Sequence, residues 1–141
     1  MKIHYLVLAL LLPFLSAAQN QPAIDKKKHK VVFQLTSNDT LVHKALVKQI
    51  RNVQTAAPNT KIEVVCHNNG ITFLQTAVSK QTAGIQELKQ AGVDFVACEN
   101  TMRERKISRE ELMAECRTVP AGLVEIIDKQ EKGWAYVKAG F

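Results

Sequence analysis

The stretch VDFVACENTMRERKIS, residues 93–108, joins an apolar run, a charged turn and a helix start around one thiol. The apolar run is short, contains Val and Phe, and ends at Cys98, which is typical of a buried β-strand. Three cations occupy the turn that follows, and Ser108 has the sequence context of a helix N-cap. In an α/β protein, ligands and reactive groups collect at the carboxyl ends of strands, so this stretch places Cys98 where chemistry is expected.

Strand and helix patterns alternate on both sides of this stretch. Apolar, β-branched runs predict strands at residues 31–36, 61–66, 93–98, 117–119 and 134–138. Apolar spacing, capping residues and a Ser108–Glu111 capping box predict helices at residues 40–55, 82–90, 108–116 and from Pro120 to Gly133, with a helical turn at 71–78. This alternation predicts a mostly parallel sheet covered on both faces, which is a three-layer α/β/α domain.

The first 18 residues have the pattern of a secretory signal peptide. Lys2 precedes an apolar run at residues 5–15, and Ser16-Ala17-Ala18 supplies small residues for cleavage. The run is shorter than the ~20 apolar residues that span a bilayer, and an uncleaved anchor is the alternative. We therefore expect cleavage near Ala18 and an exported protein, periplasmic or secreted. The mature chain then consists of a polar linker at residues 19–30 and one α/β domain at residues 31–141.

The formal net charge of the chain is +6, and part of it lies in the run Asp25-Lys26-Lys27-Lys28-His29-Lys30. Basic runs of this kind bind nucleic acid or anionic lipid in some proteins and are solvated tails in others. An exported protein meets little nucleic acid, and no aromatic residues interleave with these cations. We expect a solvated tail, no nucleic-acid partner, and no stable membrane insertion once the signal peptide is removed.

Three loops follow the carboxyl ends of predicted strands and therefore share one rim of the sheet, at residues 37–40, 67–71 and 99–106. The first loop is rich in helix N-cap residues, so capping is the simpler explanation of its composition, and anion binding at a helix N-terminus is the alternative. The candidate binding residues on this rim are Asn38, His67, Asn69, Asn100, Arg103 and Arg105.

Cys98 is the candidate nucleophile of the rim. The reactive form of cysteine is the thiolate, which nearby cations and helix N-termini favour. Arg103, Arg105 and Lys106 follow Cys98 within a few residues. The alternative is a buried cysteine that packs as a small hydrophobic residue, and the exposure and pKa of the thiol decide between the two.

Cys66 ends another predicted strand, and if the two strands are neighbours their backbones lie ~5 Å apart. That spacing is near disulfide range when the cysteines are level and point compatibly, so Cys66 is either a resolving thiol for Cys98 or a core residue. A metal site of Cys66, His67 and Cys98 is a further alternative, but the spacing matches no metal-binding signature. Cys116 is expected in the core. P-loop, GxGxxG and GxSxG motifs are absent, and we expect neither a cofactor nor a bound metal.

Three segments carry a family resemblance: KIEVVCHNNGI at residues 61–71, GVDFVACENTMRERKIS at 92–108 and VPAGLVEIIDKQEKGWAYVKAG at 119–140. Together they resemble the DsrE/DsrF-like (DsrEFH-like) sulfur-relay family, and especially its small exported members. The resemblance implies a five-stranded α/β/α sandwich that assembles into a trimer or hexamer. It also implies that a strand-end cysteine carries a persulfide and passes sulfur between partner proteins, and Cys98 matches that position. Cys66 stands where the family has a small or apolar residue, which raises the prospect of an intramolecular disulfide.

The leading hypothesis is an exported DsrE-like protein that binds or transfers sulfane sulfur as a persulfide on Cys98, as a sulfur carrier or sulfurtransferase. Its partners are then a sulfur donor and an acceptor thiol, and Cys66 is the candidate resolving thiol. The alternative is a non-catalytic module that binds a small ligand or partner, or assembles oligomers, around a structural or disulfide-bonded Cys98. A metal-binding protein that uses Cys66, His67 and Cys98 is the third hypothesis.

Overall fold

A five-stranded sheet, in which all strands are parallel, forms the middle layer of the molecule. The computed structural model describes residues 23–140. In spatial order the strands are β4 (Cys116–Val119), β3 (Asp94–Cys98), β2 (Lys61–Cys66), β1 (Lys30–Leu35) and β5 (Ala135–Lys138). Every neighbouring pair is parallel. The five predicted strands are therefore confirmed, and the two edges of the sheet are its shortest strands, β4 and β5.

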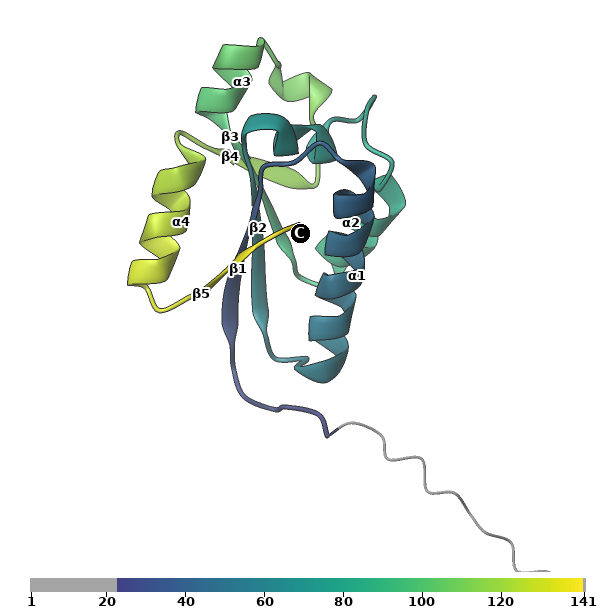
Figure 1. The fold of residues 1–141 in the computed structure, drawn as a ribbon, viewed down its shortest axis with the longest axis vertical. Helices are drawn as coiled ribbons and strands as arrows, with labels where there is room; N and C mark the ends of the chain where they lie inside the picture. The colour runs from purple at the N-terminus through teal and green to yellow at the C-terminus, as the bar shows by residue number, and fades with distance from the viewer. Residues whose placement is uncertain (1–22, 141) are drawn as a thin grey trace, which may run out of the picture.

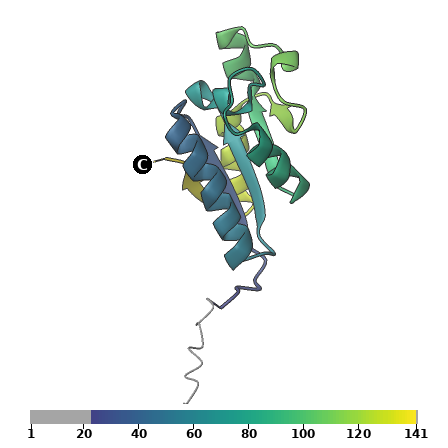
Figure 2. The ribbon, with the colours of Figure 1, turned by 90° about the vertical axis from the view of Figure 1, so that its right-hand side faces the viewer.

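Helices cover both faces of this sheet. α1 (Thr40–Ala56) and α2 (Thr82–Gln90) lie on one face, and α4 (Gly122–Glu131) lies on the other (Figure 1). Figure 2 shows the same layers from the side of α1, with α4 behind the sheet. This arrangement confirms the predicted three-layer α/β/α sandwich. Beyond the carboxyl ends of the strands lie α3 (Glu99–Arg105) and the short 3₁₀ helices η1 (Asn68–Leu74) and η2 (Arg109–Glu111).

The core has two unequal halves, because alternate residues of each strand point to opposite faces of the sheet. The larger half lies under α1 and α2, and it includes Phe33, Val64 and Phe95. The smaller half, under α4, consists of the buried residues Val32, Val65, Val96, Val119 and Ile126. The attachment of α4 therefore rests on less apolar burial than that of α1.

Ion pairs supplement this attachment. Glu63 of β2 is 1% exposed, and its carboxylate accepts hydrogen bonds from Lys129 of α4 and, at 3.1 Å, from Arg117 of β4. Arg117 also donates to Glu125 of α4 and to Asp94 of β3, at 2.7 Å in both cases. Burial raises the pKa of the Glu63 carboxyl, although Lys129 and Arg117 oppose the change. This charged network links α4 to three strands of the sheet.

The predicted helices α1 and α2 form where the sequence places them. α2 has the predicted bounds, and α1 extends one residue beyond its predicted end. Asp39 caps α1, because its carboxylate accepts a hydrogen bond from the Leu41 N–H at 2.8 Å. Capping thus accounts for the loop at residues 37–40, and Asn38 is exposed in that loop.

The charged stretch after Cys98, for which the sequence predicts a turn, is the helix α3. Cys98 is its N-cap, and Lys106 ends it in the left-handed conformation at a φ of 56°. Glu, Met and Arg have high helix propensity, and cations in the last turn interact favourably with the helix dipole, so the charges do not prevent a helix here. The predicted turn is wrong, and the backbone amides of a helix begin directly after Cys98.

The helix predicted at residues 108–116 is also wrong, because only the 3₁₀ turn η2 forms there. The Ser108–Glu111 capping box is confirmed. Beyond it, the Arg109 side chain donates to the backbone carbonyls of Met113 and Cys116, at 3.2 and 2.6 Å, which holds this segment outside a helix. Cys116 consequently begins β4 instead of ending a helix, and it packs in the larger half of the core as expected.

The N-terminal predictions fall only partly on described residues. The predicted signal peptide, residues 1–18, lies outside the part of the chain that the structure describes. Part of the predicted linker is attached to the domain: the Asp25 N–H donates to the Ala56 carbonyl at 2.7 Å, and the His29 carbonyl accepts the Lys61 N–H at 2.9 Å. Between residues 23 and 140, no helix combines the length and apolar character needed to cross a bilayer.

Candidate functional site

Cys98 lies where the carboxyl end of β3 meets the amino ends of α3 and α4. It is the last residue of β3 and the N-cap of α3. Its Sγ accepts a hydrogen bond from the backbone N–H of Gly122, the first residue of α4, at 3.2 Å. The side chain is 5% exposed, so only a small part of it reaches solvent. Cys98 therefore lies at the predicted rim of the sheet, and its sulfur atom is close to the backbone amides of two helix starts.

These surroundings favour the thiolate of Cys98. Burial disfavours a charge, but the Gly122 N–H that donates to the sulfur outweighs it together with the polar groups of Thr101 and Asn100, and they lower the pKa of the Cys98 thiol below its ordinary value. Thr101 is buried, and its Oγ1 accepts the Asn68 N–H at 3.0 Å, which leaves its hydroxyl proton for the sulfur. The pKa of Cys98 is therefore set mainly by burial and by these donors, whereas the sequence analysis expected the neighbouring cations to lower it.

Gly122 is a glycine because there is no room for a side chain. A Cβ atom on this residue would lie 3.2 Å from Cys98 Cβ, 3.2 Å from Val65 Cγ1 and 3.4 Å from His67 Cβ. The first two distances are tighter than ordinary van der Waals contact between carbon atoms, so any larger residue would push the first turn of α4 away from the sheet. The Gly122 amide reaches the sulfur of Cys98 because this residue has no Cβ.

Cys66 and Cys98 point to opposite faces of the sheet. Cys66 is in register with Ala97, so Cys98 comes one residue later on β3, and successive strand residues alternate between faces. Cys66 and Cys116 both belong to the core half under α1 and α2, while Cys98 contacts α4. All three cysteines are free thiols, and burial raises the pKa of both Cys66 and Cys116. The strands that end at Cys66 and Cys98 are neighbours, which is the condition for a disulfide, but their pairing does not bring the two thiols together.

His67 shares the α4 face with Cys98 and is part of a chain of polar side chains. The Gln34 side-chain amide donates to His67 Nε2 at 2.8 Å, and the Tyr136 hydroxyl donates to Gln34 Oε1. Burial lowers the pKa of His67, so the ring is neutral at neutral pH. Gln34 is the residue that sequence reasoning missed. The available sign was a single amide inside the otherwise apolar strand VVFQL.

Arg105 fixes the loop that follows His67. Its guanidinium donates to the side-chain carbonyls of Asn68 at 2.7 Å and Asn69 at 2.6 Å. Asn68 has a φ of 52°, a left-handed conformation that asparagine adopts more readily than most residues. Arg105 and Asn69 were predicted as ligand-binding residues on separate loops, and the structure joins them to each other. In this conformation they order the rim around Cys98.

The remaining predicted binding residues differ in their relation to the thiol. Asn100 lies in the first turn of α3, and its side chain accepts a hydrogen bond from Arg103. Its backbone N–H donates to the Pro120 carbonyl at 3.2 Å and also contributes to the lowered pKa of Cys98. Asn38 lies in the loop before α1, where Asp39 provides the cap. The rim thus contains His67, Asn69, Asn100, Arg103 and Arg105 near the ends of β2 and β3, while Asn38 follows β1.

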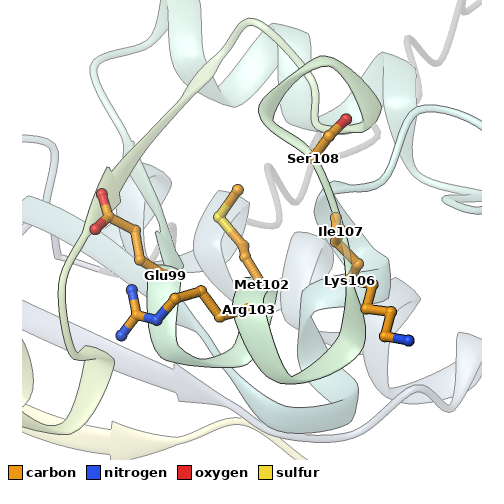
Figure 3. A pocket seen from close by; sticks show the side chains of 6 residues that line it. All are labelled: Glu99, Met102, Arg103, Lys106, Ile107 and Ser108. Atoms are coloured by element: carbon orange, nitrogen blue, oxygen red, sulfur yellow. The ribbon is translucent and has the colours of Figure 1, made fainter.

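A surface cavity of about 490 Å³ opens beside α3. Its lining consists of Glu99, Met102, Arg103, Lys106, Ile107 and Ser108. In Figure 3, Arg103 and Lys106 extend in different directions from α3, and the Arg103 guanidinium lies on the side of Glu99. The Glu99 carboxylate accepts the Thr118 hydroxyl at 2.7 Å. This cavity adjoins the residue after Cys98 and combines two cations with an apolar wall.

The structure does not assemble the metal site that the third hypothesis requires. Cys66 faces α1 and α2, whereas Cys98 and His67 face α4, so the sheet separates the proposed ligands. Within residues 23–140, no group of three or more His, Cys, Asp or Glu side chains is arranged to hold a metal ion.

Comparisons with known proteins bear on the whole domain. The model of the DsrE/DsrF-like family matches residues 29–139. Among solved structures, the chain is similar to MTH1491 from Methanobacterium thermoautotrophicum, which is described as a protein of unknown function. The two are 30% identical with a TM-score of 0.75, and the match covers 78% of this chain and 98% of the other. None of the curated proteins compared with the chain matches it.

Proposed function

Because the chain belongs to the DsrE/DsrF-like family, whose general role is in sulfur relay, we propose that it binds and transfers sulfane sulfur as a persulfide on Cys98. One observation carries this proposal: Cys98 Sγ accepts the Gly122 N–H in surroundings that lower the pKa of the thiol. A thiolate is the form of cysteine that attacks sulfur, and it is also the better leaving group. The same amides therefore support both loading and unloading.

The loading step is a displacement at sulfur. The Cys98 thiolate attacks the outer sulfur of a donor persulfide R–S–SH, and a bond forms between Cys98 Sγ and that sulfur. The donor S–S bond breaks, and its electron pair leaves with the donor as a thiolate. In unloading, an acceptor thiolate attacks the outer sulfur of the Cys98 persulfide, and Cys98 leaves as a thiolate. Neither step needs an added oxidant or reductant, because one S–S bond replaces another.

Cys66 has no step in this proposal. Its side chain lies on the other face of the sheet and is completely buried. Burial also raises the pKa of its thiol, which disfavours the thiolate that resolution of a persulfide requires. Attack on Cys98 would need β2 or β3 to turn over. The structural arguments thus support a single working cysteine.

We expect the protein to act outside the cytoplasm after cleavage near Ala18, with exported thiol proteins as donor and acceptor. Association with copies of itself, as a trimer or hexamer, is also expected. The exposed apolar side chains of α4 support an association surface close to Cys98, since Leu123, Val124 and Ile127 are all more than half exposed. Contiguous exposed apolar residues are typical of protein interaction sites.

A second candidate function follows from the low exposure of Cys98. A thiol that is 5% exposed can be structural, in which case the rim is a non-catalytic binding or assembly surface. Treatment with inorganic polysulfide, followed by digestion and mass spectrometry, separates the two. The sulfur-carrier proposal predicts one added sulfur on the Cys98 peptide. Cys66→Ser and Cys116→Ser proteins should retain that addition and Cys98→Ser should lose it; an unmodified Cys98 in the wild-type protein would favour the structural role.

A further inference from the structure

His67 and Cys98 are neighbours on the α4 face of the sheet. Cys66 of β2 is opposite Ala97 of β3, so the next residues, His67 and Cys98, stand opposite each other one step beyond the paired region. The His67 backbone stays extended, with φ −144° and ψ 172°, so its side chain continues the alternation and leaves the face of Cys66. A Cβ on Gly122 would meet both Cys98 Cβ and His67 Cβ, which places the two side chains on either side of one backbone position.

Two polar side chains, Tyr136 and Gln34, connect the sheet edge to this pair. Tyr136 of β5 donates its hydroxyl proton to Gln34 Oε1, and the Gln34 amide nitrogen faces His67 Nε2 at 2.8 Å. An amide nitrogen only donates, so His67 Nε2 must accept. The single proton of a neutral imidazole then lies on Nδ1. The hydrogen-bond order of the chain thus selects one tautomer of His67.

The surroundings keep this ring neutral. Burial disfavours the imidazolium form, and none of the ion pairs among residues 23–140 includes His67. The charged and titratable groups on this face of the sheet include Cys98 of β3, Tyr136 of β5 and Lys138 of β5, which is in register with Gln34. Glu63 of β2 shares the face, and its carboxylate is paired with Lys129 of α4 and Arg117 of β4. Arg105 of α3 is engaged with the asparagine side chains of the loop. A neutral Nδ1–H can donate to an anion without giving its proton away.

We infer that His67, as the Nδ1–H tautomer, donates a hydrogen bond to the outer sulfur of the Cys98 persulfide, and that Gln34 and Tyr136 are positioning residues that hold this tautomer. The inference rests on the proposed persulfide. The resting Cys98 sulfur is already served by the Gly122 amide and the first turn of α3, so His67 acts on the added sulfur atom. No proton moves in this role, since the ring retains the Nδ1 proton while its N–H stabilises the negative charge on the outer sulfur.

The tautomer can be tested without any sulfur chemistry. Nitrogen-15 NMR of the imidazole rings in the wild-type protein should show His67 protonated on Nδ1 and bare on Nε2 at neutral pH. Gln34→Glu replaces the amide by a carboxylate of the same shape that can only accept, so the proton should move to Nε2. An Nε2–H tautomer in the wild-type protein, or no change on Gln34→Glu, would overturn the inference whatever the function of Cys98.

The effect on sulfur can be tested on the polysulfide-loaded protein. Ionisation of the outer sulfur, followed by ultraviolet absorbance against pH, should become about tenfold less favourable in His67→Ala, as expected for the loss of a hydrogen bond to a charged group. His67→Asn, whose side-chain N–H can replace Nδ1–H, should recover most of the loss, and ionisation of the unloaded Cys98 thiol should change little. Loaded variants that ionise like the wild type would overturn the inference and leave the proposed function standing. A wild-type protein that takes up no sulfur would overturn both the proposed function and this inference. The NMR result then shows separately whether the tautomer of His67 is the one inferred.

Discussion

The backbone N–H of Gly122 donates a hydrogen bond to Cys98 Sγ at 3.2 Å, although the two residues are 24 positions apart in the chain. The contact exists because β3 and α4 meet at one rim of the sheet and because Gly122 carries no Cβ. It contributes to the lowered pKa of the Cys98 thiol. It also makes that pKa depend on how α4 is held, which connects the charged network of Glu63, Arg117 and Lys129 to the reactivity of the thiol.

Gly122→Ala should raise the pKa of Cys98 and lower stability. The new Cβ would crowd Cys98 Cβ and Val65 Cγ1, and overpacking of this kind typically lowers the free energy of unfolding by about 1–3 kcal/mol. The rate of alkylation by iodoacetamide against pH reports the thiol pKa, and denaturant unfolding reports stability. Gly84→Ala in α2 is the control, because its Cβ would lie 3.0 Å from Val47 on the other face of the sheet. It should lower stability without moving the pKa of Cys98; a shift in both variants would argue against a specific role for the Gly122 amide.

Thr101→Val should also raise the pKa of Cys98. The substitution keeps the shape of the side chain but removes the hydroxyl that accepts the Asn68 N–H and faces the sulfur. Leaving that N–H unpaired should destabilise the fold by about 1–3 kcal/mol. Thr101→Ser keeps the hydroxyl and should behave like the wild type in the same alkylation titration. Equal pKa values for the Val and Ser variants would contradict a role for the hydroxyl.

Lys129→Met should destabilise the protein strongly, because it leaves the buried Glu63 carboxylate without its closest cation. Breaking a buried pair in this way costs about 3–5 kcal/mol. A group whose pKa is raised on folding favours the folded state below its unfolded pKa and loses that contribution as pH rises through the folded value. The pKa of Glu63 is raised, so the cost should be smaller in mildly acidic solution than at neutral pH, as measured by denaturant unfolding.

Lys132→Met supplies the comparison for this experiment. Lys132 pairs with Asp128 at 2.7 Å on the surface of the same helix, and both side chains are exposed. A solvent-exposed pair of this kind contributes little to stability, because water and salt screen it. Equal losses for the two variants would show that the buried network does not hold α4 as described.

Arg103→Gln should reduce the preference of Cys98 for anionic reagents. Arg103 belongs to the rim and lines the cavity beside the cysteine. The ratio of alkylation rates with iodoacetate and iodoacetamide, which differ in charge but little in size, should fall by about fivefold, as for a change of about 1 kcal/mol between two unit charges near 4 Å in water. Lys48→Gln, an exposed cation on α1, should leave the ratio unchanged. The same fall in both variants would indicate net charge alone.

Much of the fold is predictable because it depends on local periodicity. Alternating strand and helix patterns suffice for the three layers, and Gly92, directly after Ala91, marks the end of α2. α3 and η2 are harder, since the charges of the first resemble a turn and the capping box of the second resembles a longer helix. What decides them is tertiary: the Arg109 side chain binds carbonyls that a helix would use.

In the candidate site, too, some features follow from local sequence and others only from tertiary contacts. The strand-end position of Cys98 can be read from residues 93–98 alone. The relation of Cys98 to Cys66 cannot, because a register difference of one residue turns a side chain to the other face of the sheet. The donors to the sulfur and the Gln34–His67 contact join residues far apart in sequence, so no local pattern announces them.

The pH dependence of sulfur uptake by Cys98 tests most directly whether the thiolate of this residue carries sulfur in the folded protein. Wild-type protein is mixed with inorganic polysulfide across a pH series, and the extra sulfur on the Cys98 peptide is measured by mass spectrometry in the folded protein and in the same protein unfolded by denaturant. We predict uptake by the folded protein with a midpoint at lower pH than in the unfolded protein, because folding lowers the pKa of this thiol. Uptake only after unfolding, or a midpoint at higher pH in the folded protein, would contradict a sulfur-carrying Cys98.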